Sequence, residues 1–275
     1  MTQPVHGLAR LDFHLADGET RLKDLYHHDP LRVLFPDPGA GEPPQAVLVT
    51  TSGGLVGGDV LEIEATVHDG ARAMLMPQAA EKIYGSDTAD CSIGVRLWAG
   101  KNAWLEYLPQ ETILFEGARL DRLMQIDAAP GASVMAGEML VFGRIARGER
   151  LSKGLVHDAW EVRIDGRLIW ADALYMDGNL ATTIADPACF DGAAAYASAL
   201  YLGDDAPDHL ETARELMDRS GPGLLTGASL VNDVLVMRWL GRDAFDLRQA
   251  FGKFWASFRA EAQGLPGQLP RLWNM

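Results

Sequence analysis

Residues 46–67 read AVLVTTSGGLVGGDVLEIEATV, two apolar segments joined by a glycine-rich run. Both segments are rich in β-branched residues, which favour strands. In the second segment Leu61 and Ile63 alternate with two glutamates, so one face is apolar and the other polar. The stretch therefore predicts two β-strands joined by a tight loop.

The loop, residues 51–59, holds four glycines and ends on a carboxylate: Gly53, Gly54, Gly57, Gly58 and Asp59. It joins strand to strand, and it lacks the Lys-Ser/Thr pair and the helix start of phosphate-binding loops. Two interpretations stay open. The glycines form a sharp corner that needs positive φ angles, which is the more common use, or they fix the Asp59 carboxylate and let another chain approach closely.

The alternating pattern continues to about residue 178. Turn dipeptides such as Asp69-Gly70, Pro130-Gly131 and Asp165-Gly166 separate about ten short runs. This spacing predicts a mainly β body, while strand periodicity leaves a sandwich, a barrel and a solenoid open. Because no strict repeat and no linker of distinct composition appears, we expect a single α+β domain over residues 1–275, dominated by β.

The last third of the chain adds two helical patterns. Residues 205–208, Asp-Ala-Pro-Asp, predict a helix start with Asp205 as the cap. Residues 243–262 carry an apolar stripe at helical spacing, which we expect to pack on the β body, with a protein-docking surface as the alternative. The stripe consists of Leu247, Phe251, Phe254, Trp255 and Phe258. Residues 229–240 predict one further strand, and residues 193–202 fit either a helix or a strand.

The composition restricts the partners and the compartment. With 24 basic and 38 acidic residues, the formal net charge of −14 argues against nucleic acid and anionic membranes as partners. Cys91 and Cys189 stand far apart and metal-binding motifs are missing from the sequence, so we expect no tightly bound metal or cofactor. Without an 18-residue apolar run or a signal-peptide pattern, we expect a soluble, cytoplasmic protein.

Catalytic motifs are equally sparse. The sequence has no G-x-S-x-G motif, and its seven histidines show no metal-ligand spacing except the adjacent His27-His28, whose side chains would diverge on a strand. Acidic residues are abundant, so a carbohydrate-active hydrolase with a carboxylate pair on a β-solenoid is the alternative function. One carboxylate, Glu138, lies within an apolar strand pattern, where it either faces solvent or needs a buried partner.

Five blocks in order resemble the urease accessory protein D family, also written UreD or UreH. They are GGLVGGD at 53–59, QAAEKIYGS at 78–86, WLEYLPQE at 104–111, the pairs Gly143-Arg144 and Gly148-Glu149, and PRLW at 270–273. The chain departs from the family pattern at Thr51-Ser52, where a proline usually precedes the first glycine pair, and near Gly85, where an arginine is common. Both departures put only local loop geometry in doubt.

The resemblance implies a non-enzymatic urease maturation factor with a β-helical body and two helices. It implies binding to apo-urease and to accessory protein F, which recruits the GTPase accessory protein G. It also implies transient passage of Ni²⁺ through the interior toward the urease active site. By position it assigns this passage to Asp59, Glu138 and Asp172, with Ser86, Lys82 and Glu111 as further function-sensitive positions.

Carboxylate oxygens suit a hydrated divalent cation that must be released again. From the resemblance we expect Glu138 and Asp172 to face each other as an interior pair. We also expect Asp59→Ala to leave folding intact while lowering the nickel content of the matured urease.

Overall fold

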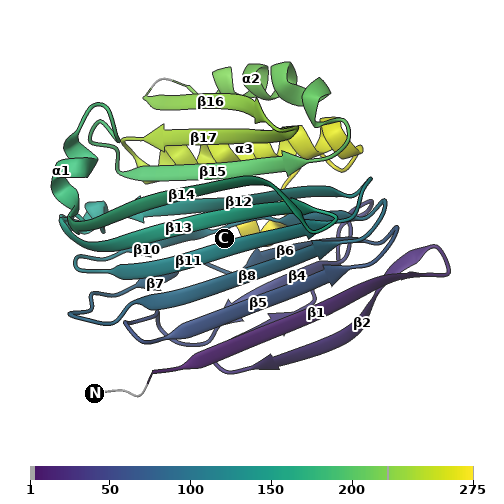
Figure 1. Ribbon diagram of the computed structural model, residues 1–275, viewed down its shortest axis with the longest axis horizontal. Helices are drawn as coiled ribbons and strands as arrows, with labels where there is room; N and C mark the ends of the chain where they lie inside the picture. Colours follow the sequence, from purple (N-terminus) through teal and green to yellow (C-terminus); the bar gives the residue numbers. More distant parts are fainter. Residues whose placement is uncertain (1–3, 222, 275) are drawn as a thin grey trace.

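The computed structural model describes residues 4–221 and 223–274, in which seventeen strands form two β-sheets (Figure 1). Sheet A has seven strands in the order β14-β13-β11-β8-β5-β1-β2. Their bounds are β1 His6–Ala16, β2 Glu19–His28, β5 Val60–Val67, β8 Cys91–Ala99, β11 Arg119–Ala128, β13 Lys153–Ile164 and β14 Arg167–Asn179.

Sheet B has ten strands in the order β16-β17-β15-β12-β9-β6-β4-β3, and β10 and β7 continue from β12 on a side branch. Their bounds are β3 Leu31–Leu34, β4 Gln45–Thr50, β6 Arg72–Pro77, β7 Glu81–Ile83, β9 Trp104–Tyr107, β10 Glu111–Leu114, β12 Ser133–Phe142, β15 Ala195–Leu202, β16 Leu224–Val231 and β17 Val234–Gly241.

The chain winds between the two sheets as a coil. It passes from β4 in sheet B to β5 in sheet A, then to β6, β8, β9, β11 and β12, which lie alternately in B and A apart from the short β7 and β10. Within each sheet these strands run parallel to their neighbours, as such crossovers require. This stacking confirms a mainly β, solenoid-like body.

The inward faces of sheet A form rows of aligned residues. Leu61 of β5 aligns with Ile93 of β8, and Ile93 aligns with Arg122 of β11. Arg122 in turn aligns with Asp158 of β13. The row is apolar over the first two strands and charged over the next two, which places a buried polar site between the sheets.

Helix α3 (Ala244–Gln263) covers the outer face of sheet B. Asp243 caps it by accepting a hydrogen bond from Asp246 N at 3.0 Å, and Gly264 ends it with φ 61°. The Trp239 ring of β17 packs edge-on against Phe251 and Phe254, with centroids 5.0 Å apart in both cases. The prediction that the aromatic stripe packs on the β body is therefore confirmed.

Other elements differ from the sequence-based expectations. The predicted single strand at 229–240 is wrong, because Asn232 and Asp233 adopt φ angles of 49° and 61° and turn the chain between β16 and β17. A helical turn begins at Ala206, as residues 205–208 predict, but Asp205 does not cap it with its side chain, because the carboxylate accepts a hydrogen bond from the Tyr201 hydroxyl at 2.6 Å. The ambiguous segment at 193–202 forms β15.

Several elements were not predicted. The N-terminal strands β1, β2 and β3 were not assigned, and a third helix, α1 (Leu180–Ala185), adds to α2 (Leu210–Asp218) and α3. Short 3-10 turns lie at η1 Ile145–Arg147, η2 Ala206–His209 and η3 Arg271–Asn274. Within residues 4–221 and 223–274, no helix combines the length and apolar character needed to cross a bilayer.

Candidate functional site

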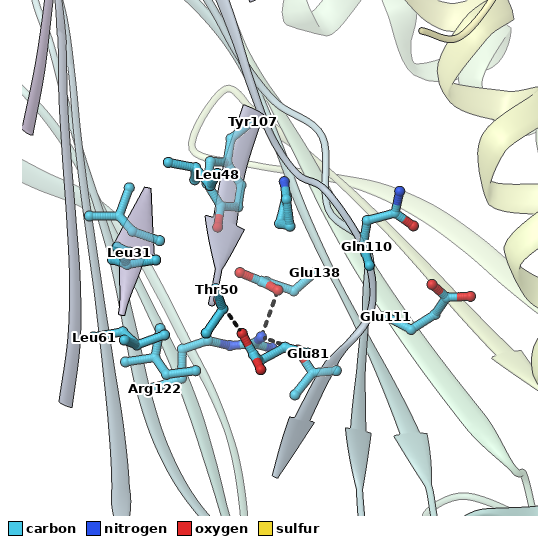
Figure 2. A pocket seen from close by; sticks show the side chains of 15 residues that line it. Leu31, Leu48, Thr50, Leu61, Glu81, Tyr107, Gln110, Glu111, Arg122 and Glu138 are labelled. Atoms are coloured by element: carbon cyan, nitrogen blue, oxygen red, sulfur yellow. Dashed lines mark hydrogen bonds and ion pairs between the residues drawn. The ribbon is translucent and has the colours of Figure 1, made fainter. Parts of the chain in front are cut away.

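A cavity of about 50 Å³ lies between the two sheets, with room for a few water molecules (Figure 2). One wall comes from the apolar part of the sheet A row, including Leu61 and Ile93. Arg122 continues this row, and the other polar lining residues come from sheet B and the segment between β9 and β10: Thr50, Glu81, Tyr107, Gln110, Glu111, Thr112 and Glu138.

Arg122 organises the polar wall. Its Nε and Nη2 donate to the two Asp158 oxygens, both at 2.9 Å, in a bidentate pair. Its Nη1 donates to Thr112 Oγ1 at 3.0 Å and lies 2.6 Å from Glu138 Oε2. All three charged side chains are at most 6% exposed, so the cluster is shielded from bulk water.

The cluster holds one cation and two carboxylates. Burial raises the pKa of Glu138 to about 8, although Arg122 is in contact, because Asp158 shares the same guanidinium and adds its own negative charge. The site therefore holds either an extra proton or a surplus negative charge.

A second pocket of about 140 Å³ shares a wall with this cavity and opens at the glycine loop. Thr50 and Glu81 line both spaces, and Thr50 Oγ1 donates to Glu81 Oε2 at 2.7 Å (Figure 2). Burial is the main cause that raises the pKa of Glu81. Gly53, Gly54 and Lys82 line the outer pocket, so the structure brings these predicted positions next to the cavity that Glu138 lines.

The glycine loop is a tight corner that packs against residues 82–89. Gly54 has a φ of 139°, and a Cβ on Gly57 would collide with Ser86 Oγ and the Ala89 carbonyl. Asp59 is buried, with Oδ1 accepting from Val5 N at 2.9 Å and Oδ2 accepting from Val56 N at 2.8 Å. Both carboxylate oxygens thus hold the corner in place.

Glu111 lies at the other end of the cavity. Its Oε1 is 3.2 Å from Arg248 Nε, and Arg248 also donates to Gln110 Oε1 at 2.8 Å. The Arg248 guanidinium lies 4.9 Å from the centre of the Trp273 ring. Helix α3 and the C-terminal segment therefore close this end with a positive charge.

Asp172 does not face Glu138. Its Oδ2 accepts from Arg238 Nη2 at 2.6 Å, at the edge of sheet A, and it does not line the cavity. Register aligns Glu138 with Ser198 of β15 and Ser198 with Arg238 of β17, so Asp172 contacts the residue at the far end of the row that begins at Glu138. The expectation of two facing carboxylates is corrected: Arg238 neutralises Asp172, and Asp158 is the carboxylate beside Glu138.

Arg122 and Asp158 were missed from the sequence, although the alternation contained a signal for both. Arg122 shares its face of β11 with the buried Leu120 and Met124, so the alternation of side chains along the strand alone predicts that Arg122 is buried. Asp158 shares its face of β13 with Val156 and Trp160 in the same way.

Glu138 and Glu111, two carboxylates of the cavity, are each paired with an arginine. Among the described residues, no three His, Cys, Asp or Glu side chains are grouped so that they could hold a metal ion. A hydrolase would need two carboxylates across an open cleft, whereas Arg122 bridges Glu138 and Asp158 here. The cavity is also far below the roughly 300–1,000 Å³ of ligand pockets.

The fold and this buried polar cavity define a non-repetitive β-solenoid protein with an internal charged site. The family model described as UreD urease accessory protein matches residues 5–274. The chain is 44% identical to "Urease accessory protein UreD" of Magnetococcus marinus, over 100% of this chain and 96% of that protein.

Two further relatives agree with this match. "Urease accessory protein UreD 2" of Methylorubrum populi is 43% identical over 94% of this chain and 85% of its own length. "Urease accessory protein UreD 1" of Brucella anthropi is 35% identical over 99% and 95%. The chain belongs to the UreD urease accessory protein family, and its role is in urease maturation.

Proposed function

We propose that the chain binds apo-urease and accessory protein F, and through F the GTPase accessory protein G, and conducts Ni²⁺ to the urease active site. Family membership supports the urease part of this proposal. The observation that carries the nickel part is the buried cluster of Arg122, Glu138 and Asp158, with two carboxylates for one guanidinium.

The cluster suits a cation in transit. Surplus carboxylate charge in a poorly solvated cavity attracts a divalent cation, because Coulomb interactions are stronger there than in water. Arg122 remains in contact with both carboxylates and opposes tight capture. Oxygen donors without sulfur or imidazole also bind Ni²⁺ weakly enough to release it.

We place the entry side at the glycine loop. Glu81 and Thr50 line both the pocket at that loop and the cavity, and this shared wall supports the placement. From Glu138 the register of sheet B continues through Ser198 to Arg238, which pairs with Asp172 at the edge of sheet A, and we place the exit side at that edge. Cys91 and Cys189 are both free thiols, which suits work in the reducing cytoplasm.

Co-purification tests the proposal. Urease subunits and accessory proteins F and G are expressed with or without a tagged copy of the chain, and the tagged complex is isolated. We expect apo-urease, F and G to co-purify with the chain, and urease activity to depend on its presence. Equal urease activity and nickel content without the chain would contradict the maturation role, and turnover in a glycoside screen would favour the hydrolase alternative.

A further inference from the structure

Sheet B extends beyond sheet A on one side of the coil. Sheet A ends at β14, whereas β15, β17 and β16 continue past that edge (Figure 1). Among the described residues β14 pairs with no strand but β13, and on it the Ile169 carbonyl accepts a hydrogen bond from Asn232 Nδ2 of the β16–β17 turn at 2.8 Å. An unpaired strand of this length is a template for another extended segment.

The inner face of the overhanging strands is apolar and partly uncovered. Register aligns Leu225 of β16 with Leu240 of β17, and Leu240 with Tyr196 of β15. Leu225, on this inner face, is 63% exposed. Its strand neighbours Leu224 and Thr226 point to the opposite face and are less exposed. A groove of about 430 Å³ runs between this face and β14, lined also by Leu174 and Phe190.

The groove lies at the outer end of the polar row that starts at Glu138. Arg238 and Asp172 line it, and their 2.6 Å ion pair bridges the overhang and the edge of β14. One strand added beside β14 would lie over β17 at the roughly 10 Å spacing of packed sheets. It would pair the free backbone edge and cover Leu225 and Leu240 at the same time.

We propose that this groove, defined by β14, β16 and β17, is the docking site for an extended segment of apo-urease, with apolar side chains on alternate positions. The assignment to urease rests on the proposed function, because the recipient of the cation must sit where the polar row reaches the surface. A second copy of this chain fits less well, because two chains with a net charge of −14 repel each other.

Chemical labelling of a native cysteine can show whether the groove is covered. Cys189 is exposed and lines it, whereas Cys91 is buried and burial raises the pKa of its thiol to about 12. Maleimide therefore modifies Cys189 in the purified chain. When apo-urease saturates the chain, the rate of this modification should fall about tenfold or more.

Two matched variants test the same face. Leu225→Asp should weaken binding to apo-urease about tenfold or more, measured by biolayer interferometry. Phe245→Asp is the control, because Phe245 is 66% exposed on α3 and lies outside the groove. Circular dichroism and melting temperature establish that both variants fold.

Two results with urease would overturn the assignment: Cys189 is labelled at the free rate within the urease complex, or both variants lose binding equally. Two results without urease would also overturn it: a second copy of the chain at high concentration protects Cys189, or accessory protein F protects it. The proposed function fails separately if apo-urease does not bind the chain at all. If urease binds and matures while Cys189 stays reactive, only the docking face is wrong.

Discussion

Arg122 on sheet A reaches across the coil to Glu138 on sheet B, with Nη1 and Oε2 2.6 Å apart and both side chains almost fully buried. The contact joins the two sheets at the cavity. It also leaves Glu138 incompletely neutralised, because the same guanidinium forms the bidentate pair with Asp158.

Removing the Arg122 guanidinium should strongly lower the free energy of unfolding. Arg122→Gln leaves Glu138 and Asp158 buried without their cation, and breaking such a pair costs about 3–5 kcal/mol in the free energy of unfolding. Urea unfolding measures this cost. Arg96→Gln is the control, because Arg96 is half exposed and its surface pairs are worth about 0–1 kcal/mol. A loss below about 1 kcal/mol for Arg122→Gln would show that the cluster contributes little to holding the sheets together.

Stability should depend on pH through Glu138. Because the folded pKa of Glu138 is about 8, above its unfolded value, its stabilising contribution is fully present below the unfolded pKa, decreases as pH rises, and is lost once pH passes about 8. Glu138→Gln removes this dependence, so the stability of the wild-type protein relative to the variant should decrease from pH 5 to pH 8 and stay constant above pH 8. Urea titrations at pH 5, 7 and 9 measure it.

Asp172→Asn is the matched control for this titration, because its ion pair with Arg238 is partly exposed and has little effect on stability. Parallel pH profiles for the wild-type protein and Glu138→Gln would mean that Glu138 stays ionised throughout and that Arg122 neutralises it fully.

We expect substitution of Asp59 to lower the stability of the fold. Asp59→Ala removes the acceptor of the Val5 and Val56 amides and should lower the free energy of unfolding by about 1–3 kcal/mol. This replaces the expectation of intact folding drawn from the resemblance. Asp87→Ala is the control, because that side chain is exposed in the neighbouring loop. Unchanged stability together with lower nickel content would restore a direct role in transport.

The aromatic stripe of α3 should behave as core. Phe251 is fully buried, and Phe251→Ala should cost about 3–5 kcal/mol in thermal or chemical unfolding. The same change at the exposed Phe245 should cost little. A loss of affinity for accessory protein F at unchanged melting temperature would make the stripe a docking surface instead.

Local patterns predicted much of this fold. Alternation in residues 60–67 and the helical spacing of the apolar stripe in residues 243–262 identified a strand and a helix that the structure confirms. The hairpin at Asn232 was missed because its turn interrupts an otherwise continuous apolar pattern, and propensity could not decide residues 193–202. The winding of the coil depends on pairing between distant strands, which periodicity does not encode.

The sequence predicted only part of the candidate site, because the site also depends on pairing between distant strands. Glu138 was singled out because a carboxylate in an apolar strand needs a partner, and the structure supplies Arg122. Asp158 comes from a strand 36 residues beyond Arg122, and only the register between β11 and β13 brings them together. Asp172 was placed in the interior because its strand is apolar, but the edge position of β14 leaves it partly exposed.

The most direct measurement of the central claim is the nickel content of urease matured with Glu138→Gln. Urease is purified from cells that express the wild-type chain, Glu138→Gln or Glu161→Gln, a control carboxylate on the outer face of sheet A, and nickel per active site is determined by mass spectrometry. We expect Glu138→Gln to fold, to co-purify with apo-urease and to leave the urease nearly free of nickel, while the control supports full loading. Full nickel loading with Glu138→Gln would contradict passage through this cavity.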